Sequence, residues 1–488
     1  MSISGALSSA LSGLTANTRQ LAVTSDNLAN ALTKGYGARE VGLTSRGGTG
    51  GVRVTEIARA LDPELTALRR EADGAAAEAE TRADGTARLA AAFGELGGNL
   101  PGLYDKSEAF QAALRALADT PESTPRQAAL LDAATDLAEG FNAASDTAAR
   151  LRADSDTEIA FLVDRVNSAT AEVAELNRLI VRAEAGGRDT ASLSDRRETL
   201  IDEIAATLPV RVYAQDNGAI ELRTAEGTLL VGTSARAISF TPTPSIGPEM
   251  VYANGAGALS GLTVGDTNIT PGSNGSQAVS GGALAGLFAL RDETAPAFSA
   301  ALDGAAEELA ARLADPLLDP TLAPGDPGLF TDAGAALAAP TAPGIAGRIA
   351  VNPAVDPAEG GALWRLRDGL GAAAEGPAST DTIPRALADA LASAAPAAGI
   401  VAAPQALSFS DRLAALGEIF STDRVAADAA RSGAEASRTA LASDEAARLG
   451  VDTDRELQAL IAIEQAYAAN AQVIRTAEAM LDELRRIG

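Results

Sequence analysis

The side chains that most often carry out catalysis or hold metals are scarce in this chain. Its 488 residues include no cysteine and no histidine, which excludes thiol nucleophiles, thiolate metal sites, disulfides and histidine-dependent catalysis. Paired carboxylates remain as a possible acid–base chemistry, and Asp452, Asp454 and Glu456 form such a cluster. They fall in the first turn of an expected helix, where negative charge stabilises the helix dipole, and the calcium-loop spacing is absent. We therefore predict no catalytic residues, no metal site and no cofactor.

The composition predicts long helices rather than a deep ligand pocket. Hydrophobic residues make up 46% of the chain but aromatic residues only 3%, and alanine, the best helix former, supplies much of that total. Ligand pockets and single-strand nucleic-acid platforms usually need aromatic side chains. The formal net charge of −26 repels phosphate backbones. We expect no nucleic-acid partner and no membrane partner, since neither a cleavable signal peptide nor a run of about 20 apolar residues is present.

Leucines and other large apolar residues repeat every seven residues at both ends of the chain. Near the start the repeat consists of Leu7, Leu14, Leu21 and Leu28, with Leu11 in the same stripe. Near the end it consists of Leu460, Tyr467, Ile474 and Leu481, with Leu457 and Leu484 on the same face. A seven-residue apolar repeat over about four heptads is typical of a coiled coil, although the first helix could also pack on its own domain's core.

Periodicity and turn residues predict the remaining elements. Helices are expected over 63–96, 107–118, 125–151, 155–185, 193–208, 284–313, 410–443 and 452–487, and short strands over 210–213, 219–223 and 228–231. Glycines between 47 and 51 predict a flexible loop. Charged runs such as Arg69-Arg70-Glu71 are expected on solvated helix faces. The expected fold is mainly α with a β-rich inserted domain, elongated and multi-domain, with the N- and C-terminal helices paired as a coiled coil.

These elements suggest four parts. Residues 1–60 and 444–488 would form a terminal helical assembly domain, and 61–208, 283–314 and 406–443 a helical domain. Residues 209–282 would form a β-rich outer domain. The Pro-, Gly- and Ala-rich segment 315–405 would be irregular or would complete that outer domain.

Both ends resemble the bacterial flagellar axial proteins, the group of rod, hook and hook-associated subunits. Ser25-Asp26-Asn27-Leu28-Ala29-Asn30, followed by Thr33 and Gly35-Tyr36, is similar to the S/A-x-N-I-A-N-x-x-T-x-G-Y motif of that family. It departs at Ala31-Leu32, where another asparagine is usual, and at Gly37. The segment from Tyr467 to Ala477, which includes Asn470, resembles the family's Y-x-A-N-A-x-V-x-x-T-A. Alone, Asn27 and Asn30 would read as capping or turn residues; with the second motif they read as assembly contacts. Asn470 would set register in a seam or face solvent.

The interior resembles the hook-associated protein 1 (FlgK) branch of that group. Arg126-Gln127 is similar to the end of its D-P-x-x-R-Q segment, residues 193–200 to its L-x-D-x-R-D-x-L helix, and residues 229–232 to its L-V-x-G strand end. Rod and hook proteins turn to β-structure soon after the N-terminal motif, whereas this chain is expected to run into long helices.

The resemblance implies a structural subunit at the flagellar hook–filament junction, exported through the flagellar type III apparatus without a cleaved signal peptide. Its implied partners are the hook protein, the second junction protein, copies of itself in a ring, and an export chaperone at the C-terminal helix. Alternatives are another axial rod or hook subunit, a secreted coiled-coil adhesin and a cell-wall hydrolase. The expected assembly interface comprises Leu7, Leu11, Leu14, Leu21, Asn27, Leu28, Asn30, Gly35, Tyr36, Leu457, Leu460, Tyr467, Asn470, Ile474, Leu481 and Leu484.

Overall fold

The computed structural model describes residues 3–33, 35–47, 50–94, 101–253, 257–395 and 406–487. It is 62% helical with only small sheets, which confirms the mainly α class. The chain divides into two compact units. Unit 1 comprises Met1–Ala76, Arg165–Ala237 and Ala434–Gly488, and unit 2 comprises Ala77–Asp164 and Ile238–Gly433. No helix within the described ranges combines the length and hydropathy of a membrane-spanning segment.

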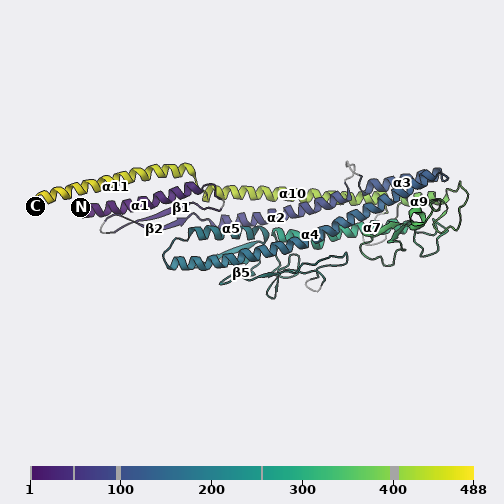
Figure 1. Cartoon of the computed structure of the whole chain (residues 1–488), viewed down its shortest axis with the longest axis horizontal. Helices are drawn as coiled ribbons and strands as arrows, with labels where there is room; N and C mark the ends of the chain where they lie inside the picture. The colour runs from purple at the N-terminus through teal and green to yellow at the C-terminus, as the bar shows by residue number, and fades with distance from the viewer. Residues whose placement is uncertain are drawn as a thin grey trace. The chain divides into compact units, whose positions relative to one another are not determined.

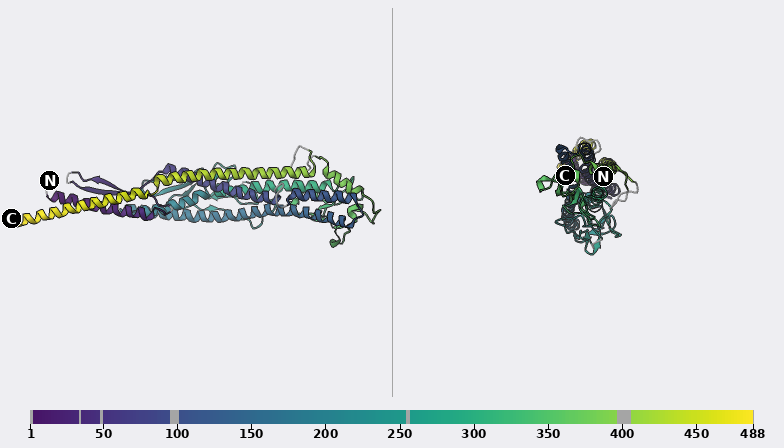
Figure 2. Two further views of the ribbon diagram at one scale, coloured as in Figure 1. Left: turned by 90° about the horizontal axis from the view of Figure 1, so that it is seen from above. Right: turned by 90° about the vertical axis from the view of Figure 1, so that its right-hand side faces the viewer.

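In unit 1 the two terminal helices lie side by side. They are α1 (Ile3–Asn30) and α11 (Thr453–Ile487). Both chain ends lie at the same end of this pair (Figures 1 and 2), and the pair is therefore antiparallel. Asp452 begins α11 by accepting hydrogen bonds from the backbone N–H groups of Asp454 and Arg455, at 3.0 and 3.1 Å, as an N-cap residue does. The terminal helices thus pack together as expected; that they wind as a coiled coil stays a prediction.

A β-hairpin follows α1, and here the sequence prediction was wrong. The sequence pattern predicts a loop that passes directly into long helices. Instead β1 (Arg39–Ser45) pairs antiparallel with β2 (Val52–Arg59), with a register shift between Gly42 and Leu43. Gly47, Gly50 and Gly51 lie between the two strands, and residues 48 and 49 lie outside the described ranges. Alternating residues of both strands are half-buried, which is the burial pattern of a hairpin covered on one face.

The rest of unit 1 is a helical layer with a small sheet. Its elements are the first part of α2 (Pro63–Phe93), the last parts of α4 (Thr124–Ala185) and α10 (Phe409–Leu449), α5 (Ala191–Thr207), and the sheet β3-β4-β5 (Val210–Ala214, Ile220–Thr224, Leu229–Val231). Asn177 joins helix to sheet: its amide donates to the Ile220 carbonyl at 2.8 Å and its carbonyl accepts from the Ile220 N–H at 3.2 Å. This pairing satisfies polar backbone groups of the sheet inside the unit.

Unit 2 contains one large apolar core. Its elements are the remainders of α2, α4 and α10, with α3 (Leu103–Asp119), α6 (Gly282–Ala289), α7 (Ala295–Arg312), α8 (Arg365–Asp368), α9 (Thr382–Ala392), the sheet β6-β7-β8 (Ile238–Ser239, Thr263–Val264, Thr267–Asn268) and the pair β9-β10 (Phe330–Asp332, Ile349–Val351). Phe110, Phe141 and Leu302 are completely buried in it. Side chains from 318–391 also join this core, so much of the Pro-, Gly- and Ala-rich segment is ordered; residues 396–405 lie outside the described ranges.

Three differences from the predicted elements have simple causes. Residues 125–151 and 155–185 form one 62-residue helix, α4, because the residues between them include neither glycine nor proline, the two residues that most disfavour a helix. Residues 284–313 are interrupted by a π-helical turn over Leu290–Thr294. The strands within 209–282 belong to two separate sheets, one in each unit, so a separate β-rich domain there remains a proposal.

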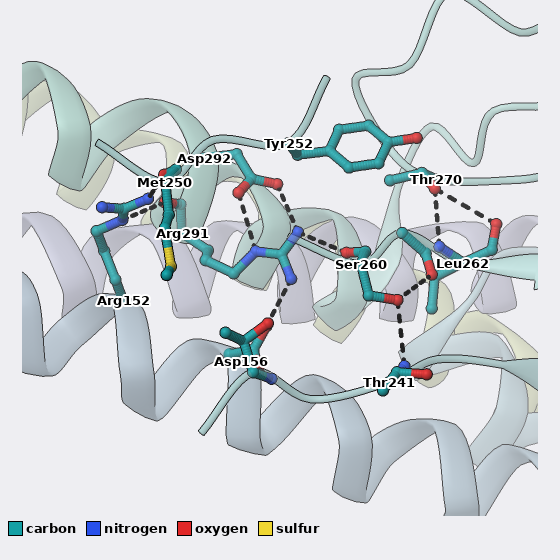
Figure 3. A network of polar contacts seen from close by, with 12 residues as sticks. Arg152, Asp156, Thr241, Met250, Tyr252, Ser260, Leu262, Thr270, Arg291 and Asp292 are labelled. Carbon is teal, nitrogen blue, oxygen red and sulfur yellow. Dashed lines mark hydrogen bonds and ion pairs between the residues drawn. The ribbon is translucent and has the colours of Figure 1, made fainter. Parts of the chain in front are cut away.

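A buried ion cluster anchors an irregular part of unit 2, and Figure 3 shows its geometry. Arg291, on the π-helical turn, is fully buried and contacts Asp156 of α4 at 2.6 Å and Asp292 at 2.9 Å. It also donates to the Ser260 carbonyl at 2.9 Å. Arg152 donates to carbonyls of residues 247, 250 and 291, and burial lowers the pKa of its guanidinium. The two arginine side chains here donate hydrogen bonds to backbone carbonyls that are not paired in a sheet.

Candidate functional site

Two contacts fix how α1 and α11 are aligned. A Cβ placed on Gly13 would lie 2.7 Å from the Asn470 side-chain nitrogen, so the missing side chain lets Asn470 approach α1. The Asn27 side-chain amide donates to Glu456 at 2.8 Å. The two contacts are separated by the same number of residues on each helix, which gives one antiparallel register along the pair. Asn470 is half-buried at this contact; that it sets register in a seam stays a prediction.

The leucine repeat of α1 lies beside this contact line rather than on it. Leu14 and Leu28 each follow a contact residue by one position, which places them about 100° around the helix from α11. The residues buried on α1 are instead small or polar: Ala10, Ala16, Asn17, Val23, Thr24 and Asn27. The contact between the terminal helices is therefore built mainly from alanine and short polar side chains.

The hairpin covers the other side of α1. The Ser12 hydroxyl accepts a hydrogen bond from the Val52 N–H at 3.1 Å, and a Cβ on Gly51 would collide with that hydroxyl. Ser12 precedes the contact residue Gly13, so the hairpin and the leucine stripe occupy opposite sides of the contact line. The hairpin therefore covers one side of α1.

The apolar repeat of α11 faces the same side as the leucine stripe. Leu460, Tyr467, Ile474 and Leu481 each lie four positions after a contact-line residue, or about 40° around the helix. Because the helices are antiparallel and both right-handed, this rotation and that of the α1 leucines point to one side of the pair. We call this side, lined by the two repeats, the uncovered face.

The uncovered face keeps large apolar side chains in solvent. Leu11, Leu21 and Leu28 are 61%, 36% and 37% exposed, and Tyr467 and Leu481 are 45% and 40% exposed. Leu7, Leu14, Leu460 and Ile474 are half-buried, while Leu457 and Leu484 are exposed toward the flanks of α11. Exposed apolar side chains gathered on one face are a common feature of interaction surfaces.

Asn27, by contrast, is completely occupied by contacts within the chain. It is 1% exposed. Its amide donates to Glu456 and, at 2.9 Å, to the Arg39 carbonyl; its side-chain oxygen accepts from the Tyr36 hydroxyl at 2.9 Å and from the Arg39 N–H at 3.1 Å. All four hydrogen-bonding positions of the amide are filled. The predicted role of Asn27 as an assembly contact stays a prediction.

Arg39 extends this cluster to α5. Its guanidinium contacts Asp195 at 2.7 Å and lies 4.8 Å from the centre of the Tyr36 ring. The other oxygen of Asp195 contacts Arg59 of β2 at 2.9 Å. Burial raises the pKa of the Tyr36 hydroxyl, although the nearby Arg39 charge acts in the opposite direction. The hydroxyl is therefore held as a hydrogen-bond donor.

Gly35 and Asn30 form the turn that presents Tyr36 to Asn27. Gly35 has a φ of +83°, and a Cβ there would meet the Thr199 hydroxyl at 2.6 Å, so glycine is required both by conformation and by space. Asn30 donates to the Asp26 carbonyl at 2.9 Å and accepts from the Thr33 hydroxyl at 3.2 Å. Its role is local, in the last turn of α1, as the capping interpretation expects.

Two sets of charged residues lie in contacts between elements. Glu456 is the partner of Asn27, a contact that the helix-dipole interpretation did not include. Arg69 and Arg70 are predicted on a solvated face, but Arg69 is half-buried and Arg70 is buried in unit 1, where Arg70 contacts Glu198 at 2.6 Å and Asp202 at 2.7 Å. Their guanidinium groups can be removed from solvent because acidic side chains of neighbouring helices form ion pairs with them. Within the described ranges, no group of three or more metal-ligating side chains is placed to hold an ion.

Sequence reasoning missed the residues that connect the motif to its surroundings. Arg39, Arg59 and Asp195 are absent from the predicted interface, although Asp195 lies in one of the segments that resembles a family motif. Their common signal is charge: two arginines at the outer ends of a hairpin and one carboxylate at the start of a helix. Because the sequence does not predict the hairpin, it could not indicate that these three charges lie together.

Three family models match separate parts of the chain. The flagellar hook-associated protein FlgK helical domain matches residues 87–315. The flagella basal body rod protein family matches residues 7–36, and the flagellar basal body rod FlgEFG protein C-terminal family matches residues 448–487. The two rod-family matches cover most of α1 with the Asn27 motif and all of α11.

Curated relatives carry the name flagellar hook-associated protein 1. The Bacillus subtilis protein is 24% identical over 286 residues, 54% of this chain and 56% of that protein. The Salmonella typhimurium protein is 25% identical over 251 residues, 49% of this chain and 45% of that protein. The chain thus spans about half the length of the curated relatives that it matches. A solved structure of the flagellar hook junction protein FlgK from Burkholderia pseudomallei is 20% identical, with a TM-score of 0.43 over 55% of this chain and 46% of that one.

The interior match selects among the axial proteins. The rod-family models describe only the terminal segments, while the helical-domain model covers α3, α4 and α5 together with the chain as far as α7. By these matches the chain is similar to the flagellar hook-associated protein 1 (FlgK) family, with the helical-domain match over residues 87–315 and relatives of that name.

Proposed function

We propose that this chain is a structural subunit of the bacterial flagellum, an adapter at the junction between hook and filament. The observation that carries the proposal is the uncovered face, where two apolar heptad stripes from opposite ends of the chain meet on one side of one helix pair. The occupants of this face would be the equivalent helices of hook subunits, of the second junction protein and of other copies of this chain in a ring. No catalytic role is part of the proposal.

Burial of the exposed stripe residues against neighbouring subunits would be energetically favourable. Full burial of a leucine or tyrosine side chain stabilises by about 1.5–3 kcal/mol. The stripe residues that stay more than a third exposed, such as Leu21 and Tyr467, therefore have a large part of that burial still to gain. In a ring the same gain is repeated at every joint.

Another rod or hook subunit is the main alternative, and the interior disfavours it. The terminal helices alone would suit any axial protein, since the rod-family models match them. The FlgK helical-domain match over residues 87–315 favours the hook-associated role. The adhesin and hydrolase alternatives find no support in these matches.

The C-terminal stripe would also be the binding site of an export chaperone before assembly. An amphipathic helix with apolar residues at heptad spacing fits an apolar groove of a partner. We propose export through the flagellar type III apparatus to the extracellular hook end, with the chaperone covering Ile474 and its stripe until release.

The test compares Ile474→Asp with Asp482→Ala. Ile474 lies in the stripe, whereas Asp482 is exposed and off it. A buried charge without a partner is strongly unfavourable, so Ile474→Asp should weaken chaperone binding in a pull-down and docking onto purified hooks. Cells that carry it should fail to assemble stable filaments, and Asp482→Ala should do neither. Normal motility and unchanged chaperone affinity with Ile474→Asp would contradict the proposal.

A further inference from the structure

The π-helical turn between α6 and α7 leaves one backbone carbonyl without a donor from its own helix, and Pro296 explains why. In this turn the Ala295 N–H donates to the Leu290 carbonyl, five residues earlier. The next bond of this kind would run from residue 296 to the Arg291 carbonyl, but proline has no N–H. Arg291 is fully buried, so its carbonyl needs a partner from elsewhere in the protein.

Arg152 of α4 supplies the missing donor. Its Nε donates to the Arg291 carbonyl at 3.0 Å. Its other two nitrogens donate to the Gly247 carbonyl at 3.1 Å and to the Met250 carbonyl (Figure 3). The planar guanidinium presents its N–H groups in a fixed fork, which suits it to several acceptors at once. One buried side chain therefore joins the π-helical turn to the irregular segment that contains Gly247 and Met250.

This segment, which we call the strap (residues 241–253 and 257–262), has a second attachment to the same turn. Asp156, one helical turn after Arg152 on α4, accepts from the Thr243 N–H at 2.6 Å and contacts the Arg291 guanidinium at 2.6 Å. Arg291 in turn donates to the Ser260 carbonyl at 2.9 Å. The described strap residues contain no strand, so side-chain contacts take the place of a backbone ladder in holding the strap.

We propose that the strap and the π-helical turn form one cooperative unit, in which Arg152 and Arg291 make the order of each depend on the other. The turn depends on Arg152 because Pro296 removes the donor that the helix would otherwise provide. The strap depends on both arginines because it has no strand to pair with. The two segments would then open and close together. The inference concerns unit 2 alone and does not rest on the proposed function.

The first test is Arg152→Met, which removes all three donors and keeps an unbranched apolar side chain. A buried carbonyl left unpaired corresponds to a roughly tenfold to hundredfold change in an equilibrium. Hydrogen–deuterium exchange of the full chain should show protection factors falling by about that factor in the strap and in the π-helical turn alike. A loss confined to the strap would show that the two segments are not coupled and would overturn the proposal.

Arg150→Met is the matched control. Arg150 lies two residues earlier on α4, is exposed, and donates to the Thr147 hydroxyl of its own helix at 3.2 Å. The protection of the strap and of the turn should stay unchanged in this variant. A loss equal to that of Arg152→Met would contradict the assignment of the effect to the three carbonyls.

Arg152→Lys separates the hydrogen bonds from the charge, and it is the milder change if Arg152→Met folds poorly. The ammonium keeps the positive charge, but it lacks the fork that reaches three carbonyls. The protection of both segments should fall by about tenfold, as expected for the loss of a hydrogen bond. Unchanged protection of both would show that charge alone holds the strap, and would overturn the proposal.

Pro296→Ala tests the link itself, because it returns an N–H that can donate to the Arg291 carbonyl. In this background the turn should no longer depend on Arg152. Adding Arg152→Met should therefore still lower the protection of the strap, where the Gly247 and Met250 carbonyls lose their donors, but should leave the protection of the turn unchanged. If Arg152→Met lowers the protection of the turn equally with and without Pro296, the Arg291 carbonyl is not the link and the proposal is wrong.

Discussion

The core of unit 2 and the terminal helix pair of unit 1 are both helical, but they differ in what their helices bury. In unit 2, α3, α4 and α7 enclose Phe110, Phe141 and Leu302 completely. In the terminal pair, α1 and α11 bury alanine, valine and short polar side chains and leave leucines in solvent. Both regions contain leucine and alanine, but α1 and α11 contain no phenylalanine, and the stripe that α1 buries is small or polar.

The two regions therefore differ in whether their large apolar side chains are buried within the chain. Burial of large side chains makes unit 2 stable on its own terms. The terminal pair is joined by the Asn27–Glu456 hydrogen bond and by small-residue contacts, and several of its large side chains stay partly in solvent. Substitutions of the same kind should therefore have different consequences in the two regions.

The largest contrast is expected between Leu114→Ala and Leu481→Ala. Leu114 is fully buried, whereas Leu481 is 40% exposed. Leu114→Ala should lower the free energy of unfolding by about 2–5 kcal/mol through lost burial and a cavity. Leu481→Ala should cost less than about 1 kcal/mol in the free chain. Chemical denaturation of both variants measures the loss in free energy of unfolding. Equal losses would contradict the claim that unit 2 buries its large apolar side chains while the terminal pair leaves them partly exposed.

Ion pairs should show the same contrast at a smaller scale. Asp156 is buried against Arg291, while Glu483 and Arg486 of α11 form an exposed pair at 3.5 Å. Asp156→Ala should cost about 3 kcal/mol because Arg291 is left partly uncompensated, although Asp292 remains beside it. Glu483→Ala should change stability by no more than about 0.5 kcal/mol. Thermal unfolding in low and high salt checks both values; a large, salt-sensitive loss for Glu483→Ala would break the comparison.

The smallest contrast is expected beside Asn27, between the unaltered chain and Tyr36→Phe. It removes one hydrogen bond to Asn27, worth about 0.5–1.5 kcal/mol. Burial raises the pKa of Tyr36 above its ordinary value, so this group favours folding below that value, and its contribution is lost as pH rises through the raised pKa. The unaltered chain should therefore lose stability above about pH 10 more steeply than Tyr36→Phe. Parallel pH profiles for the two proteins would contradict a buried donor at this position.

Sequence reasoning succeeded where a repeat or a motif carried the information. The seven-residue repeats at Leu7–Leu28 and Leu460–Leu481 and the Asn27 and Asn470 motifs identify both terminal helices without any geometry. The periodicity alone predicts that the repeats form the seam between those helices. They lie instead beside it, because Gly13 and Asn470 bring the backbones together along a neighbouring stripe, and periodicity cannot say which of two adjacent stripes faces the partner.

The missed features depend on contacts between distant segments. The hairpin of β1 and β2 has half-polar strands that are stable only because α1 covers one face. Arg69, Arg70 and Asp195 look like solvated charges until partners from other helices are brought beside them. Long-range ion pairs leave no local pattern, so a single sequence could not reveal them.

The central claim, that the uncovered face is where neighbouring subunits pack, can be tested by cysteine reactivity, because the chain contains no thiol of its own. Leu21→Cys and Tyr467→Cys place a thiol on this face, and Arg188→Cys places one on an exposed turn after α4. Alkylation rates would be measured in the free chain and in assembled flagella. The account predicts that the thiols at positions 21 and 467 react readily in the free chain and become protected on assembly, while the thiol at 188 stays reactive. Undiminished reactivity of both face positions in assembled flagella would contradict it.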